Sequence, residues 1–160
     1  MKAKTSSIIF SIYILLAFYV FGGGMVDSLV VFRTWPLVGE KEFPAFHQKD
    51  NMQIIPVFVI AFFLSFIPQI LLFWFRPLVI PKWMILVAFA LNLIMLISSI
   101  TIQIPIQIEL DKMFSASLIG QLIETDLKYR VIPMILQAII NFMMLFKVIS
   151  YNTTRKLVLS

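Results

Sequence analysis

Residues 54–104 decide the fold: IIPVFVIAFFLSFIPQILLFWF (54–75), then RPLVIPK (76–82), then WMILVAFALNLIMLISSITIQI (83–104). Each apolar stretch is close to the ~20 residues that an α-helix needs to cross ~30 Å of hydrocarbon. The short segment between them carries basic charges and two prolines. We therefore predict a hairpin of two transmembrane helices.

Two further apolar stretches, 8–31 and 131–150, have the same character. The prediction is an all-α, four-helix transmembrane bundle, with residues 1–160 forming one integral membrane domain. An alternative for the N-terminal end is a signal peptide, because Lys2 and Lys4 precede an apolar run that reaches the small residues Gly22 to Gly24. A retained first helix is the simpler account, because the apolar run continues to Phe32.

The charges alternate between the two ends of the spans. The N-terminus, the second loop and the C-terminal end hold only bases, namely Lys2, Lys4, Arg76, Lys82, Lys147, Arg155 and Lys156. The first and third loops mix bases with acids, which leaves Asp27 as the only acid within a predicted span. Since Lys and Arg near helix ends set orientation, both termini should be cytoplasmic and the two long loops should face outward. The high Ile, Phe and Lys content favours a bacterial plasma membrane.

The composition excludes several classes of function. With 61% hydrophobic and 13% charged residues among 160, the chain has no room for a separate soluble catalytic domain. Membrane topology and anionic headgroups account for the net charge of +5, so we expect no nucleic-acid partner. The absence of cysteine removes disulfides and thiol chemistry. Phosphate-loop, HExxH and GxSxG motifs are also missing, and we expect neither a cofactor nor a metal site.

The outward loops are too long to be simple connectors. Aromatic side chains and a histidine accompany the charges of the first loop: Trp35, Phe43, Phe46 and His47. In the third loop, apolar residues recur at near-helical spacing: Phe114, Leu118, Leu122 and Tyr129. These patterns predict interfacial segments, helical in the third loop, that cap the outer mouth of the bundle.

The chain also divides into two helical hairpins of similar plan. The second helix of each opens with Ile-Pro, at Ile55-Pro56 and at Ile132-Pro133. The prolines either mark two helix starts or reflect an internal duplication with parallel topology.

Polar residues within the spans fall at helical spacing. They are Ser65 and Gln69 in the second span, Asn92, Ser99 and Gln103 in the third, and Gln137 and Asn141 in the fourth. An unpaired polar group in hydrocarbon is costly, so these stripes should converge inside the bundle. They form either interhelical hydrogen bonds or a polar-lined pocket that opens outward.

Asp27 is the strongest single candidate, since a carboxylate within a span normally has a function and a cationic partner. Arg33 and Arg130 are the expected partners. The alternative is a structural Asp–Arg pair that joins the first helix to the fourth. His47, the only histidine, is either an interfacial side chain or a proton carrier beside Asp50.

Two stretches of the sequence resemble those of a known protein family: QIPIQIEL (103–110) and LIETDLKYR (122–130). With them the chain resembles a group of small four-helix bacterial membrane proteins of unassigned function, which is similar to the anthrone-oxygenase-like family. In this resemblance, Pro105 and Gln107 correspond to a motif of proline and a polar residue. Tyr129 and Arg130 correspond to a motif of an aromatic residue and arginine. The chain departs from the pattern in having tyrosine in place of tryptophan at 129 and no histidine beside Arg130. These departures weaken the transfer of cofactor-independent oxygenase activity to this chain.

Three hypotheses follow. The first is a pocket at the extracytoplasmic mouth that binds a small apolar or amphiphilic ligand. Its candidate residues are Asp27, Arg33, His47, Gln103, Gln107, Asp126, Tyr129, Arg130 and Gln137. The second is a structural or accessory subunit whose outward loops, through Trp35 or Phe114, bind a second copy or another membrane protein. The third is an ion or proton carrier that uses Asp27. Membrane lipid is a partner in all three.

Overall fold

A computed structural model describes the backbone of residues 2–159 and the side chains of residues 4–154, and all of its regular structure is helical. Four long helices are long and apolar enough to cross a membrane: Lys4–Leu37, Phe43–Phe75, Lys82–Leu110 and Ala116–Thr154. They confirm the prediction of an all-helical structure with four helices that could span a membrane. Of the basic side chains counted above, Lys2, Arg155 and Lys156 lie outside the described residues.

Each long helix contains a π-helical turn, in which the backbone widens by one residue. The first long helix consists of α1 (Lys2–Val26), η1 (Asp27–Val31), α2 (Phe32–Thr34) and the 3₁₀ turn η2 (Trp35–Leu37). The second consists of α3 (Phe43–Ile54), η3 (Ile55–Val59) and α4 (Ile60–Phe75). The third consists of α5 (Lys82–Ser98), η4 (Ser99–Gln103) and α6 (Ile104–Leu110). The fourth consists of α7 (Ala116–Asp126), η5 (Leu127–Val131) and α8 (Ile132–Leu159).

The helices extend further than the sequence predicts. Most of the two segments expected to be outward loops is helical and continues the spans, so that the connections shrink to 38–42 and 111–115. Even the shortest long helix, of 29 residues, measures ~43 Å at ~1.5 Å per residue, which exceeds the ~30 Å of hydrocarbon. The predicted amphipathic helix of the third loop is present as α7, where the Ser115 hydroxyl caps it by accepting from the Leu118 N–H at 3.3 Å.

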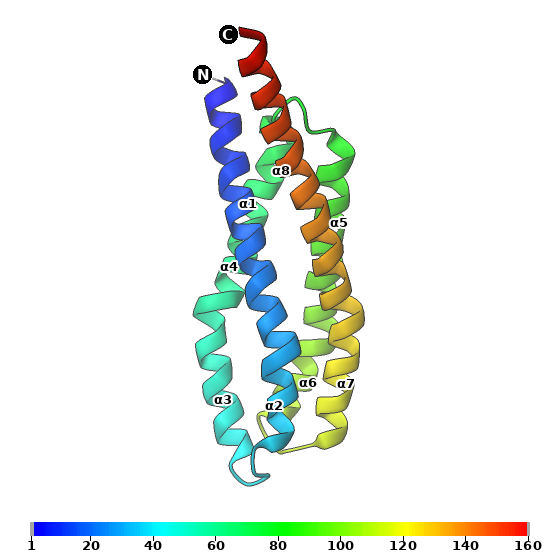
Figure 1. Ribbon diagram of the computed structural model, residues 1–160. Helices are drawn as coiled ribbons and strands as arrows, with labels where there is room; N and C mark the ends of the chain where they lie inside the picture. The colour runs from blue at the N-terminus through cyan, green and yellow to red at the C-terminus, as the bar shows by residue number, and fades with distance from the viewer. Residues whose placement is uncertain (1, 160) are drawn as a thin grey trace.

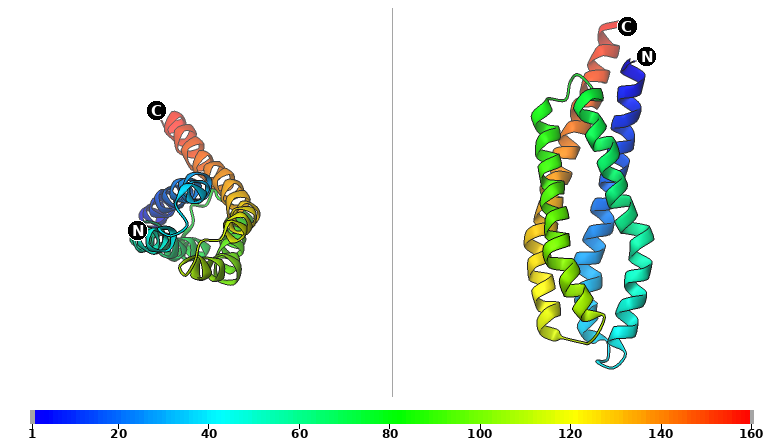
Figure 2. Two further views of the ribbon diagram at one scale, coloured as in Figure 1. Left: turned by 90° about the horizontal axis from the view of Figure 1, so that it is seen from below. Right: turned by 180° about the vertical axis from the view of Figure 1, so that it is seen from behind.

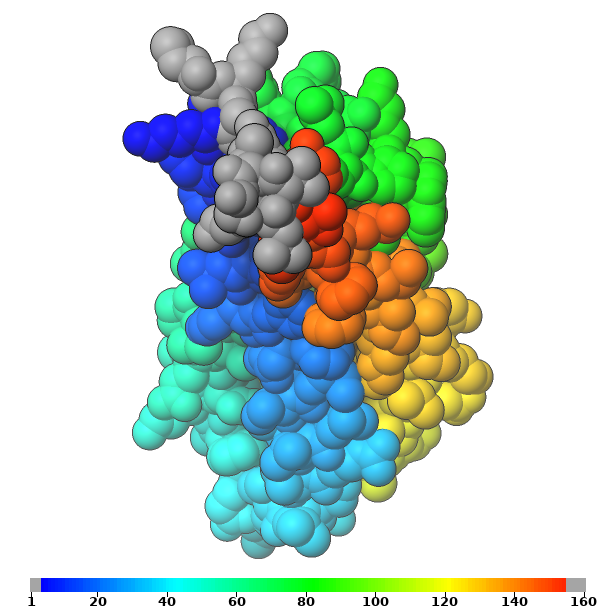
Figure 3. Space-filling view, turned by 45° about the horizontal axis from the view of Figure 1, so that its top comes forward, coloured from blue at the N-terminus to red at the C-terminus, as the bar shows by residue number. Residues whose placement is uncertain are grey.

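The long helices form two hairpins that lie side by side (Figure 1). Within them, α1 packs along α4 and α5 packs along α8, while α1 also contacts α8 and thereby joins the hairpins. Both described chain ends lie at the same end of the bundle, as Figure 1 and the right-hand view of Figure 2 show. In the space-filling view, the first long helix runs between the α3 side and the α7–α8 side (Figure 3). Contact between α4 and α5 is sparser than between α1 and α4.

A polar network holds the half of the bundle nearest the termini together. Tyr13 Oη donates to Asn141 Oδ1 at 2.7 Å and accepts from Gln69 Nε2 at 3.4 Å, and Asn92 Nδ2 donates to Gln69 Oε1 at 2.5 Å. Each long helix contributes one of these four buried side chains. Polar residues of the spans therefore meet at this level, where they form hydrogen bonds between helices.

The π turns recur at a constant interval along the chain. From Asp27 to Ser99, and from Ile55 to Leu127, the interval is 72 residues. The two hairpins therefore carry their π turns at equivalent positions. The Ile-Pro pairs at 55 and 132 are 77 residues apart and do not follow this register.

Proline contributes to the wide turn of the fourth helix. Pro133 lacks the N–H that would bond to the carbonyl of Tyr129, four residues before it. That carbonyl, inside η5, instead accepts a hydrogen bond from Ser98 Oγ at 3.4 Å, across to the third long helix. The wide turn is therefore supported by a neighbouring helix.

We predict that Tyr13→Phe lowers the free energy of unfolding by about 1–2 kcal/mol, because it removes the hydroxyl that joins three helices. Steric-trap unfolding in bicelles would measure the change. The matched control is Tyr151→Phe, at an exposed ring near the end of the described side chains. Equal stability of the two variants would contradict the role given to the network.

Candidate functional site

A cavity of about 430 Å³ lies among the four π turns, in the half of the bundle away from the termini. The second and third long helices supply most of its wall, and Asp27 of η1 and Arg130 of η5 complete it. The remaining lining residues are Asn51, Ile54, Ile55, Phe58, Val59, Phe62, Phe63, Leu96, Ser99, Ile100, Gln103, Ile104, Gln107, Ile108 and Asp111. Its volume falls in the range of small-molecule sites.

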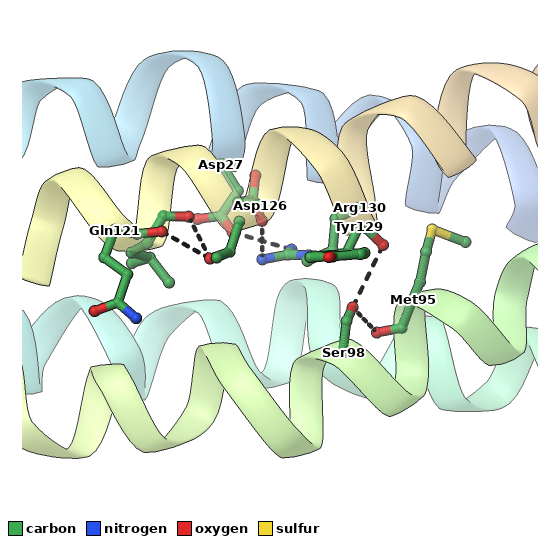
Figure 4. Close-up of polar contacts among 9 residues, drawn as sticks. Asp27, Met95, Ser98, Gln121, Asp126, Tyr129 and Arg130 are labelled. Atoms are coloured by element: carbon green, nitrogen blue, oxygen red, sulfur yellow. Dashed lines mark hydrogen bonds and ion pairs between the residues drawn. The ribbon is translucent and has the colours of Figure 1, made fainter.

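Arg130 lies between two carboxylates at the base of the cavity (Figure 4). Its Nη1 is 2.8 Å from Asp126 Oδ1, one turn earlier on the same helix, and its Nη2 is 3.4 Å from Asp27 Oδ2. All three side chains are buried, and the guanidinium carbon also lies 5.9 Å and 5.7 Å from the ring centres of Phe32 and Phe58. Both ion pairs and both rings thus hold the guanidinium in one place.

A glycine makes this arrangement possible. A Cβ atom added at Gly24 would lie 2.5 Å from Met134 Sδ and 3.3 Å from a ring carbon of Phe58. The missing side chain therefore lets the second and fourth long helices approach the first closely enough for Phe58 to reach Arg130.

A second polar cluster lies at the end of the cavity farther from the chain termini. His47 is fully buried, with Nδ1 2.6 Å from Asp111 Oδ1, and Asn51 Nδ2 donates to the same carboxylate oxygen at 3.2 Å. The imidazole lies edge-on to Trp35 and stacks on Phe43, with ring centres 4.6 Å and 5.5 Å away. This cluster joins α3 to the end of α6, and it places Asp111 rather than the expected Asp50 beside the histidine.

Gln103 is the unusual polar residue of the wall. It is 1% exposed and lines the cavity from η4, yet neither amide atom has a hydrogen-bond partner within the described part of the chain. A buried amide without partners costs about 1–3 kcal/mol. An occupant of the cavity with a polar group could satisfy it.

The structure gathers some of the predicted site residues and separates others. Asp27, Gln103, Gln107 and Arg130 line the cavity, Asp126 holds Arg130, and His47 lies behind Asp111. Arg33 and the side chain of Tyr129 are exposed, and Gln137 lies elsewhere, donating to the Ala88 carbonyl at 3.3 Å.

Sequence reasoning missed Asn51, Asp111 and the Phe58–Phe62 wall as parts of a site. Asn51 and Asp111 fall in segments that read as loops, where no periodicity brings them together. For the phenylalanines the only signal is their spacing of four residues, which is equally typical of ordinary helix packing.

Comparisons with protein-family models, with curated proteins and with solved structures find no match to this chain. The function must therefore be argued from the residues themselves.

We predict that Arg130→Met costs about 3–5 kcal/mol of stability, because it leaves two buried carboxylates without a cation. Adding Asp27→Asn and Asp126→Asn to the same chain should recover most of the loss. Unfolding of the single and triple variants in one bicelle system tests this. A triple variant no more stable than the single one would show that the charges are not the cause.

Proposed function

We propose that the protein binds a small amphiphilic molecule in the cavity among the four π turns. The observation that supports the proposal is Gln103, a residue on the wall of a ligand-sized cavity whose buried amide has no hydrogen-bond partner among the described residues. The wall combines this amide and the Asp27–Arg130 pair with phenylalanine and isoleucine side chains. Such a mixture suits a molecule with an apolar body and a polar end.

The accessory-subunit hypothesis is less well supported by the geometry. Trp35 and Phe43, which a partner protein would have to reach, are 1% and 0% exposed and pack around His47. Phe114 is half-buried against Phe43. These aromatic residues are engaged inside the bundle rather than displayed on its surface.

For the third hypothesis, an ion or proton carrier, the described residues form no continuous polar route through the bundle. An apolar layer that includes Val20, Phe62, Met95 and Met134 lies between the Asp27 level and the Tyr13 network. A translocated proton or ion needs polar groups or water throughout its route. The layer supports binding at one level of the bundle rather than transport through it.

We predict that Ser99→Trp abolishes ligand retention, because the half-buried Ser99 lines the cavity and an indole there would fill it. Mass spectrometry of small molecules that co-purify in lipid nanodiscs is the measurement. Ile97→Trp is the matched control, since Ile97 is on the same helix, 58% exposed and outside the cavity wall. Wild type and Ile97→Trp should retain a stoichiometric species that Ser99→Trp loses. Retention of only bulk lipid by all three proteins would contradict the proposal.

The proposal places the cavity near the outer face of a bacterial plasma membrane, with both termini cytoplasmic. This orientation follows from the positive-inside rule, because Arg76 and Lys82 border the short connection at the same end of the bundle as the termini. At the opposite end, the connection 38–42 carries Glu40 and Glu42 along with Lys41.

The natural lack of cysteine makes this orientation directly testable. Leu37 and Leu78 are 85% and 94% exposed at opposite ends of the bundle. Leu37→Cys should react with a membrane-impermeant maleimide in intact cells, and Leu78→Cys only after permeabilisation. The reverse pattern would invert the orientation.

A further inference from the structure

We infer that the occupant of the cavity is a lipophilic cation, a hydrocarbon chain that ends in an amine or quaternary ammonium group and enters sideways from the bilayer. This inference rests on the proposed function and adds the charge of the ligand and its route of entry. Three features carry it: the balance of buried charge, the chemistry of the wall and the character of the rim.

The buried charge is unbalanced. Asp27 and Asp126 both face Arg130, and Arg130 is the one cationic side chain among the described residues that line the cavity. Arg130 donates a hydrogen bond to Asp27 at 3.4 Å and forms an ion pair with Asp126 at 2.8 Å, so one guanidinium serves two carboxylates. Of these two acids, Asp27 is the one that lines the cavity. A buried carboxylate is stable when a cation is near, and a cationic head beside Asp27 would supply the missing charge.

The wall beside Asp27 suits an ammonium group. The amide oxygen of Gln103 is an acceptor without a described partner, and Phe62 and Phe63 present further aromatic rings to the cavity. Aromatic faces attract alkylammonium ions through the ring quadrupole, most strongly where water is excluded. An anionic head would instead meet Asp27 and Asp111 on the same wall.

The rim of the cavity consists of apolar side chains on the side where the second and third long helices face each other. Four isoleucine side chains of the wall are about half exposed, each between 49% and 55%: Ile55, Ile100, Ile104 and Ile108. These residues lie on helices that are long and apolar enough to span a membrane. The rim therefore opens toward lipid and leaves room for the chain of an amphiphile to extend into the bilayer.

Three probes with the same chain separate charge from hydrophobicity: decyltrimethylammonium, decylsulfonate and decanol. Saturable binding of each to the protein in nanodiscs, corrected with empty nanodiscs of the same lipid, is the measurement. We expect the cation to bind at least about tenfold more tightly than the sulfonate, since the acids of the wall repel an anion. Decanol should fall between them.

The variant Asp27→Asn should reduce the preference for the cation over decanol by about fivefold or more, because it leaves one carboxylate for one guanidinium. The control is Glu124→Gln, an exposed acid paired with Lys128 on the outer surface of α7, and it should keep the wild-type preference. Ser99→Trp should bind none of the probes saturably.

The outcomes distinguish the two proposals. If the three probes bind wild type equally, or the sulfonate binds best, the inference of a cation is wrong while the binding function stands. If no probe binds saturably, or Ser99→Trp binds as wild type does, the binding function itself fails. Competition by decylphosphocholine as strong as by the cation would support ammonium recognition and identify a membrane lipid as its source, whereas weak competition would support a free amine.

Discussion

The burial of a single guanidinium constrains the half of this bundle that lies away from the termini. Arg130 is 8% exposed in a helix that is long and apolar enough to span a membrane, where an unpaired charge would be very costly. Its two carboxylates come from different long helices, so the ion pairs fix the first helix against the fourth. Phe58 adds the second helix through its ring. The glycine at 24 follows from the same constraint, because the three helices must approach closely around that side chain.

The wide turns explain how a cavity persists beside such a tightly held group. A π turn inserts one residue into a helix and rotates the side chains that follow, so it interrupts the regular packing of apolar faces. All four long helices carry one, and residues of all four turns line the cavity. On the terminal side of this level, regular α-helices pack Phe10, Leu72, Met84 and Met144 into a closed core. The contrast places the site where the helical register changes.

The sequence was sufficient to predict the helical membrane fold, because runs of apolar residues and the distribution of charge are strong signals. A lone intramembrane acid needs a cation, so Arg33 and Arg130 could be predicted as partners of Asp27, and the structure pairs it with Arg130. The continuation of the helices beyond the spans could not be predicted from pattern, because charged and aromatic residues alternate without a clear period in segments such as FPAFHQKDNMQI (43–54). The contact between His47 and Asp111 spans 64 residues and depends on that continuation. The π turn of the fourth helix combines Pro133 with a bond from Ser98 of another helix to the Tyr129 carbonyl, and the local sequence does not reveal that second contribution.

We propose that an amphiphile lies between the second and third long helices with its polar end beside Asp27 and Gln103. A cryo-electron microscopy map of the protein in native-lipid nanodiscs tests it most directly. We expect elongated density that reaches from Gln103 past Ile100 into the bilayer. A map in which Phe62 and Ile100 close the cavity, with the Gln103 amide bonded to protein groups, would contradict it.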